Sequence, residues 1–228
     1  MAKSQKKAIF GELEKKVHRQ NGSGRCGLAA IRSCLHYQFG IFVTEERAVN
    51  EIGNFDNYRN KTITAADIEK WLGMKGVKPR ELCAYERKLL LIHKHGVSPN
   101  VMAAYLKKKS GQSIKVVASS EGCYRELDKI INGLWPAVKI VPIIHQMVKY
   151  DDDDELDGHY MMFCGTHRYN GKTKVRLFDP SFTHSGFKEY SPREFMRNWK
   201  GNGGDERWFL LAVPESVKLD QKFRGRYL

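Results

Sequence analysis

The sequence predicts an α+β fold in which a helical lobe packs against an antiparallel β-sheet lobe. Apolar residues recur at helical spacing through the first half of the 228-residue chain, whereas strand-like runs dominate the second half. In the second half, Asn170-Gly171 separates two strand-like runs, and this dipeptide is the strongest short-range signal for a β-hairpin. The composition, 41% hydrophobic and 29% charged, is ordinary for a globular chain.

The first predicted helix runs from about Cys26 to Gln38 and ends at Gly40. Leu28, Ile31 and Leu35 recur at helical spacing, and the remaining faces of this segment carry small or apolar residues. A helix that is apolar on all sides belongs in the interior of a protein. We therefore expect a central, buried helix that begins at a cysteine.

Four more helices are predicted in the first half of the chain. Thr64 and Asp67 form a capping-box pattern at the start of one of them, and Ser98-Pro99 is an N-cap followed by proline at the first helical position. The predicted ranges are 46–52 after Thr44, 65 to about 76, a segment within 79–95, and a helix from residue 99.

The second half is predicted to alternate strands with short helices. Proline or glycine and turn residues bound the apolar runs that indicate strands. The predicted strands are 114–118, 136–144, 158–169, 172–179 and 208–213, and the predicted helices are 124–132 and a segment from Ser191 to Trp199.

Charge is the unusual feature of the composition. Lys and Arg number 39 against 26 Asp and Glu, which leaves a net charge of +13. A balance of this kind favours an acidic partner, such as nucleic acid or an anionic membrane face. Aromatic and basic residues are not interleaved, however, so nucleic acid is possible but not favoured. We expect a basic N-terminal arm (1–19), one domain (20–214) and a basic C-terminal tail (215–228).

The five cysteines, Cys26, Cys34, Cys83, Cys123 and Cys164, form no CxxC pair. An odd and widely spaced set favours free thiols in a reducing compartment over disulfides or a structural zinc site, and no cofactor or metal is expected. No apolar run has the roughly 18–20 residues that span a bilayer, and the N-terminal segment lacks the apolar region of a signal peptide. We therefore expect a cytoplasmic monomer without membrane contact, with delivery to another compartment left open.

Three residues in the order of a catalytic triad carry the chemistry. Cys26 is predicted at the N-terminus of a buried helix, where unpaired N–H groups lower the pKa of a thiol. His159 starts a strand, and Asp179 ends the partner strand just before Pro180. This order supplies a nucleophile, a base and a group that orients the base. Gln20, six residues before Cys26, could donate a hydrogen bond to the oxyanion together with the Cys26 N–H.

These residues resemble the papain-like peptidases that process bacteriocin leaders at a double glycine, and their stand-alone relatives. The resemblance rests on Gln20, on Cys26-Gly27 opening a helix, on Gly158-His159 before an apolar strand, and on Asp179-Pro180 after the next strand. It spans about 20–213 and implies a papain-like fold. It also implies that the glutamine is the oxyanion-hole donor, the cysteine the nucleophile, the histidine the base and the aspartate its orienter. The family members that act on leaders are usually fused to a membrane exporter, so their substrate does not transfer.

The predicted hairpin sets a condition on this triad. With a two-residue turn at Asn170-Gly171 and two regular strands, His159 and Asp179 lie on opposite faces of the sheet. The triad therefore requires either a three-residue loop over 168–170 or a β-bulge, a common device beside active sites. An unbulged hairpin with the tight turn would count against the triad.

Other readings of the sequence stay open. His145 is a rival base, but it follows a strand and has no carboxylate at a matching later position. The expected function is a cysteine peptidase that acts on a peptide or protein through an acyl-thioester. The alternatives are a glutamine deamidase or acyltransferase on the same site, as in phytochelatin synthases, and a non-enzymatic basic binding protein. If the acidic loop 151–157 borders the cleft, it favours a basic substrate segment.

Overall fold

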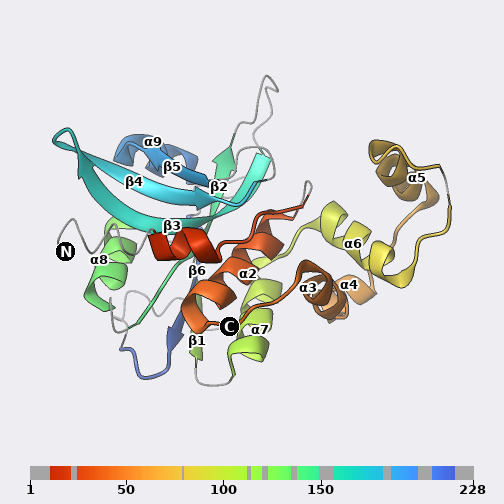
Figure 1. Ribbon diagram of the computed structural model, residues 1–228, viewed down its shortest axis with the longest axis horizontal. Helices are drawn as coiled ribbons and strands as arrows, with labels where there is room; N and C mark the ends of the chain where they lie inside the picture. Colours follow the sequence, from red (N-terminus) through yellow and green to blue (C-terminus); the bar gives the residue numbers. More distant parts are fainter. Residues whose placement is uncertain are drawn as a thin grey trace.

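The structure is a computed structural model that describes residues 11–21, 25–78, 80–111, 114–119, 123–134, 138–148, 157–181, 186–199 and 207–218. It is a mixed α/β fold in which most helices precede the sheet along the chain. Within these residues, six strands form one antiparallel sheet in the order β1-β6-β2-β3-β4-β5. Figure 1 shows the strongly curved sheet on one side and the helices α3 to α6 extending away from it on the other.

The helices begin where the sequence places their caps. The side chains of Thr44, Thr64, Ser98 and Ser191 each accept a hydrogen bond from the backbone N–H three residues later. The described helices are α2 (Cys26–Phe39), α3 (Glu45–Ile52), α4 (Asp56–Arg59), α5 (Ala65–Met74), α6 (Ala84–His95), α7 (Pro99–Ser110), α8 (Tyr124–Leu134) and α9 (Pro192–Asn198). The short α4 was not among the predicted elements.

The strands are β1 (Ile114–Ser119), β2 (Ile143–Val148), β3 (Asp157–Tyr169), β4 (Lys172–Asp179), β5 (Gly186–Tyr190) and β6 (Phe209–Pro214). The edge strand β5 was missed in the sequence, because it is only five residues long and none of them is fully buried. The remaining strands and the antiparallel pairing agree with the prediction, except for the position of β2.

The strand predicted over 136–144 begins only at Ile143, so this prediction was wrong over most of its length. Residues before it use their N–H groups elsewhere: the Val138 N–H donates to Leu134 O, and the Val141 N–H donates to Gln38 Oε1. Pro142 has no N–H to give to a ladder. The apolar run is therefore a buried extended segment, and the strand starts after the proline.

Two apolar cores lie on the two faces of the sheet. Consecutive residues of β3 enter different cores: Met162 packs in the core that includes α2 and α7, and Phe163 packs in the core that includes α8 and α9. This alternation is the period-two pattern of a strand buried on both faces. Helix α2 packs directly against β3, so the helix that begins with Cys26 lies on the sheet.

A β-bulge, one of the two alternatives expected from the sequence, interrupts the β3–β4 hairpin. The turn is the tight Asn170-Gly171 turn, with positive φ at both residues, and the register shifts between Phe163 and Thr166. Gly165 has a φ of 94°, and Asp128 of α8 accepts hydrogen bonds from the Thr166 N–H and hydroxyl at 2.7 and 2.8 Å. Because of the bulge, residues 159 and 179 lie on the same face of the sheet.

The segment expected to be an N-terminal arm packs on the domain from residue 11 onward. Residues 11–16 are helical. Leu13 is 1% exposed and belongs to the core that includes α2 and α7, and Glu12 forms an ion pair with Lys139. Residues 1–10 and 219–228, which hold the outer parts of the predicted arm and tail, lie outside the described residues. Among the described helices, none has the length and apolar character to cross a membrane.

Candidate active site

Cys26 is the first residue of α2, and its side chain is partly exposed. Burial of the sulfur opposes its ionisation. Hydrogen bonds from the His159 side chain and from the N–H groups of Tyr160 and Gly27 outweigh this effect and hold the pKa of Cys26 below its ordinary value. The thiol therefore has the setting of an activated nucleophile.

His159 lies between the thiol and a carboxylate. Its Nε2 is 2.7 Å from Oδ1 of Asp179, and its ring also hydrogen-bonds Cys26. Because Nε2 faces the carboxylate, Nδ1 is the ring nitrogen left for the sulfur. The side chains of His159 and Asp179 are 5% and 2% exposed, so this contact is shielded from water.

The surroundings of His159 stabilise its charged form. Burial alone would lower the pKa of the imidazole, but the hydrogen bonds and charges of Asp179 and Cys26 raise it to about 9. The pKa of the thiol moves in the opposite direction. Together, the two shifts favour a thiolate–imidazolium pair over the neutral thiol and imidazole at neutral pH.

Asp179 is held by its own chain. Burial would raise its pKa, but the bond to His159 and the N–H of Ser181, which donates to Oδ1 at 2.8 Å, lower it. An aspartate that accepts from the N–H two residues later forms an Asx turn, and Pro180 between them fixes its geometry. Ser181 was missed in the sequence, where the run Asp-Pro-Ser was the signal that could have identified it.

Gln20 lies next to the carboxylate end of the site. Its N–H donates to Pro180 O at 2.8 Å, which places it beside the end of β4. Its side-chain Oε1 is buried and has no hydrogen-bond partner among the described residues. Residues 22–24, which join Gln20 to the start of α2, lie outside the described residues, and the role of Gln20 as oxyanion donor stays a prediction.

The remaining candidates differ from this arrangement. Cys34 and Cys164 are buried, and burial raises the pKa of each to about 12. His145 lies opposite Tyr160 across the β2–β3 ladder, with the two ring centres 5.0 Å apart. The structure groups Cys26 with His159.

An apolar hollow opens beside the first turn of α2. Met102 of α7 and Tyr160 of β3 line it, together with Ile143 and Trp208. A Cβ at Gly27 would lie 3.1 Å from Met102 and 3.2 Å from Tyr160, so only glycine lets α2 approach this wall without displacing it. The hollow therefore adjoins the residue that follows Cys26.

Two further expectations concern groups beside the site. Of the predicted acidic loop 151–157, residues 151–156 lie outside the described residues and Asp157 is the first residue of β3, so the relation of the loop to the site is untested. Among the described residues, no group of three or more His, Cys, Asp and Glu side chains is placed to hold a metal ion.

The site thus combines the Cys26 thiol, a buried imidazole and a buried carboxylate in one chain of hydrogen bonds. The chain matches no protein-family model, and none of the curated proteins compared with it matches either. The resemblance to papain-like peptidases therefore rests on the quoted motifs and on the geometry of these side chains.

Proposed function

We propose that the protein is a papain-like cysteine peptidase that cleaves a peptide or protein substrate through an acyl-thioester on Cys26. The observation that carries the proposal is the position of His159, bonded through Nε2 to the Asp179 carboxylate and on its other side to the Cys26 thiol. A nucleophile, a base and an orienting group in one shielded chain are the components of a catalytic triad.

The proposed reaction begins with attack by the Cys26 thiolate on a substrate carbonyl carbon. The C–S bond forms, and the carbonyl oxygen becomes an oxyanion that the Cys26 N–H and the Gln20 amide stabilise. His159 then gives its proton to the leaving amine as the C–N bond breaks. Water adds to the thioester with His159 as general base, and the acid product leaves as the thiol is restored.

The place of Gln20 beside the end of β4 supports its part in this scheme. The Gln20 N–H bond to Pro180 keeps this residue on the side of the site where Asp179 lies.

An apolar hollow adjoins Gly27, the residue after Cys26. Met102 and Tyr160 are among the side chains that form its wall. Helix α2, which carries the nucleophile, packs on β3, which carries the base, and this packing is what the proposed papain-like fold requires.

The test is a comparison of product masses. Wild-type protein and Cys26→Ala are each incubated with a mixture of peptides of varied sequence, and all products are weighed by mass spectrometry. The proposal predicts pairs of fragments that wild type produces and Cys26→Ala does not. Cys26-dependent products that gain about one dalton would instead show a glutamine deamidase, and joined products an acyltransferase. If no product depends on Cys26, the enzymatic proposal is wrong.

A further inference from the structure

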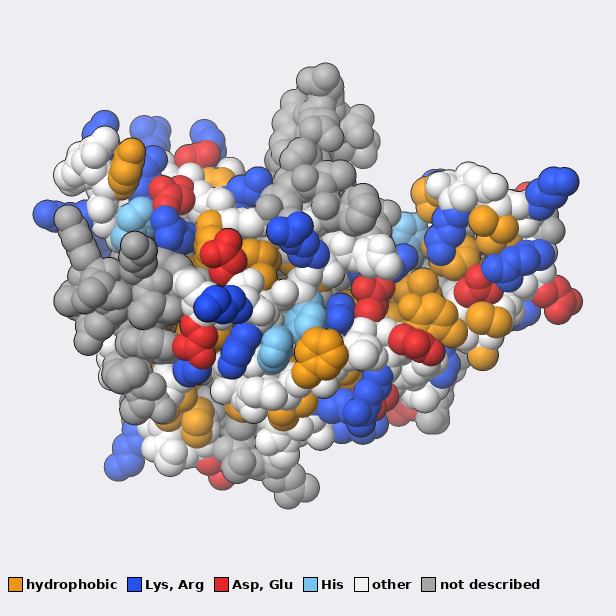
Figure 2. Space-filling model, viewed as in Figure 1, with side chains coloured by type: hydrophobic (Ala, Val, Ile, Leu, Met, Phe, Trp, Pro, Cys, Tyr) orange, Lys and Arg blue, Asp and Glu red, His pale blue; other side chains and the backbone are white. Residues whose placement is uncertain are grey.

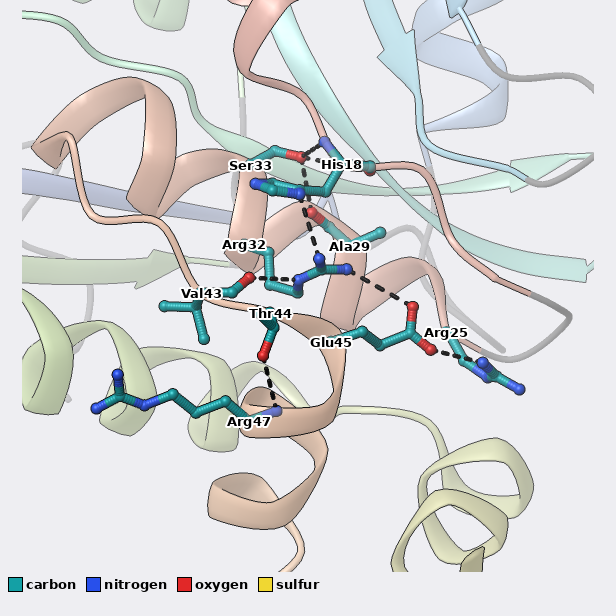
Figure 3. A network of polar contacts seen from close by, with 9 residues as sticks. All are labelled: His18, Arg25, Ala29, Arg32, Ser33, Val43, Thr44, Glu45 and Arg47. Carbon is teal, nitrogen blue, oxygen red and sulfur yellow. Dashed lines mark hydrogen bonds and ion pairs between the residues drawn. The ribbon is translucent and has the colours of Figure 1, made fainter. Parts of the chain in front are cut away.

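A buried network of charges centred on Glu45 joins the two segments that flank Cys26 (Figure 3). Glu45 is the first residue of α3, and its Oε1 accepts a hydrogen bond from Nη1 of Arg25 at 2.6 Å. Its Oε2 lies 3.6 Å from Nη1 of Arg32, a residue of α2. The side chains of Arg25, Arg32 and Glu45 are only 8%, 10% and 16% exposed. Water therefore screens these pairs little, and their geometry matters more than that of surface pairs.

Arg32 extends the network to the chain before Cys26. Its Nε donates to Val43 O at 2.9 Å, and its Nη2 lies 3.2 Å from Nδ1 of His18. A guanidinium group has donors only, so the His18 ring accepts this bond and is neutral. Burial, followed by the charges of Arg32 and His36, lowers the pKa of His18 to about 4. The ring therefore remains an acceptor throughout the neutral range.

The segment that begins at His18 is fixed at both ends. The His18 N–H donates to the Ser33 hydroxyl of α2 at 2.7 Å, and the Gln20 N–H donates to Pro180 O at 2.8 Å. This segment therefore connects α2 with the end of β4. On the other side of the undescribed residues 22–24, Arg25 is tied to Glu45 directly.

The N-terminus of α2 has an unusual cap. Arg25 occupies the N-cap position but makes no side-chain cap bond, and the first turn holds no acidic residue. A Ser, Thr, Asp or Asn cap would fix the helix end but would also occupy N–H groups of the first turn. The ion pair between Arg25 and Glu45 fixes the N-terminus of α2 through the side chain of Arg25. The Arg25 side chain therefore does not occupy the Cys26 N–H, the backbone donor of the proposed oxyanion hole, whereas the Gly27 N–H bonds the Cys26 sulfur.

We propose that Glu45 is a positioning residue for the oxyanion hole. It holds Arg25 next to Cys26 directly, and it holds the Gln20 segment through Arg32 and His18. The relative position of the two donors of the oxyanion hole, the Cys26 N–H and the Gln20 amide, is thereby fixed. This inference rests on the proposed function, because it assigns Glu45 a part in the same reaction.

Two reagents separate this role from general support of the fold. Iodoacetamide alkylates the Cys26 thiolate by displacement of iodide at a CH2 carbon, a step that forms no oxyanion. 4-Nitrophenyl acetate acetylates the same thiolate: the sulfur adds to the ester carbonyl, the oxyanion collapses, and 4-nitrophenolate leaves. The ratio of the acetylation rate to the alkylation rate at Cys26 measures how well the oxyanion is stabilised, because both rates depend on the thiolate in the same way.

The test variants are Glu45→Gln and Arg25→Met, with Gln20→Ala as the reference that removes a donor. Glu46→Gln is the matched control, because Glu46 is an exposed neighbour in α3. We expect acetylation to fall about 10- to 100-fold in Glu45→Gln and Arg25→Met, since small displacements of catalytic groups have effects of this order. Alkylation should stay within about two-fold of wild type, and Glu46→Gln should change neither rate.

Near-UV circular dichroism checks that each variant is folded. If Glu45→Gln is unfolded, Arg25→Met decides the test, because it leaves Glu45 opposite Arg32. The inference is overturned if both rates fall by the same factor, or if neither falls. If wild-type Cys26 reacts with neither reagent faster than the other thiols, the proposed function itself fails. That result is distinct from a normal wild type with unaffected variants.

Discussion

His159 shares its two ring nitrogens between a carboxylate and a thiol, and each group changes the ionisation of the others. The raised pKa of His159, about 9, and the lowered pKa of Cys26 describe one proton that moves from sulfur to nitrogen. Between the two pKa values the charged pair persists. Below the lower value the thiolate is protonated, and above the higher value the imidazolium loses the proton that the leaving amine needs.

Replacing the carboxylate tests the part of Asp179 in this pair. In Asp179→Asn the negative charge beside Nε2 is lost, while the buried volume is kept. The pKa of His159 should therefore fall below its wild-type value of about 9. An NMR titration of the His159 ring protons, assigned with His159→Gln, measures this change. The exposed Glu69→Gln on α5 is the control and should leave the midpoint in place. An unchanged midpoint in Asp179→Asn would refute the assigned role.

The order of the site residues could be predicted from the sequence because each marks the end of an element. Cys26 opens a helix, His159 stands near the start of a strand, and Asp179 ends one. Glu45 could not be predicted in this way. Its partner Arg25 is twenty residues away, and only the packing of α3 beside α2 brings the two together.

At the level of elements, the bulge in β3 determines whether the site can form. Without the shift between Phe163 and Thr166, the tight turn would direct His159 and Asp179 to opposite faces. Gly165 supplies the positive φ of 94° that the bulge needs. Asp128 of α8 accepts a hydrogen bond from the N–H of Thr166, the residue after Gly165. Helix α8 therefore stabilises the bulged register of β3 and β4.

A matched pair of glycine substitutions tests the bulge. In Gly165→Ala the new Cβ would lie 3.0 Å from Asp128 Oδ1, at a φ that L-residues avoid. We expect a loss of about 1–2 kcal/mol and a fall in Tm of about 2–8 °C. In Gly133→Ala, within α8, no atom lies within 4 Å of the new Cβ. That variant should match wild type or gain up to about 1 kcal/mol. Equal Tm values for both variants, measured by calorimetry, would contradict the strain at Gly165.

The boundaries of elements were predictable where a side chain caps the backbone locally. Thr64 with Asp67, and Ser191 with Glu194, form the capping boxes that begin α5 and α9. The start of β2 was not predictable, since it depends on Gln38 of α2 accepting the Val141 N–H. That contact joins residues 103 positions apart and leaves no local pattern.

In the whole molecule, the sheet separates two cores, and the site lies where α2 meets β3. The nucleophile belongs to the helical part, and the base and its carboxylate belong to the sheet. The net charge of +13 is a property of the surface. Figure 2 shows Lys and Arg side chains spread over the visible face and interspersed with Asp and Glu, without one continuous basic patch.

This distribution predicts weak, salt-sensitive binding to polyanions that does not involve the site. Immobilised heparin should retain the protein at low salt, and wild type and Cys26→Ala should elute at the same salt concentration. Free heparin should leave the rate of Cys26 alkylation unchanged. Protection of Cys26 by heparin, lost at high salt, would show instead that the polyanion occupies the cleft and would favour a basic binding protein.

The central claim is that His159 converts Cys26 to a thiolate, and the alkylation rate at pH 6 tests it most directly. Each protein is treated with iodoacetamide, and all five thiols are mapped by mass spectrometry. An ordinary thiol is less than about 1% ionised at this pH, so Cys26 should react well before the others. In His159→Gln its rate should fall at least about tenfold, because burial of the sulfur remains and the imidazolium is gone. Equal, slow labelling of all five thiols in wild type, or a Cys26 rate that is the same in His159→Gln, would contradict the claim.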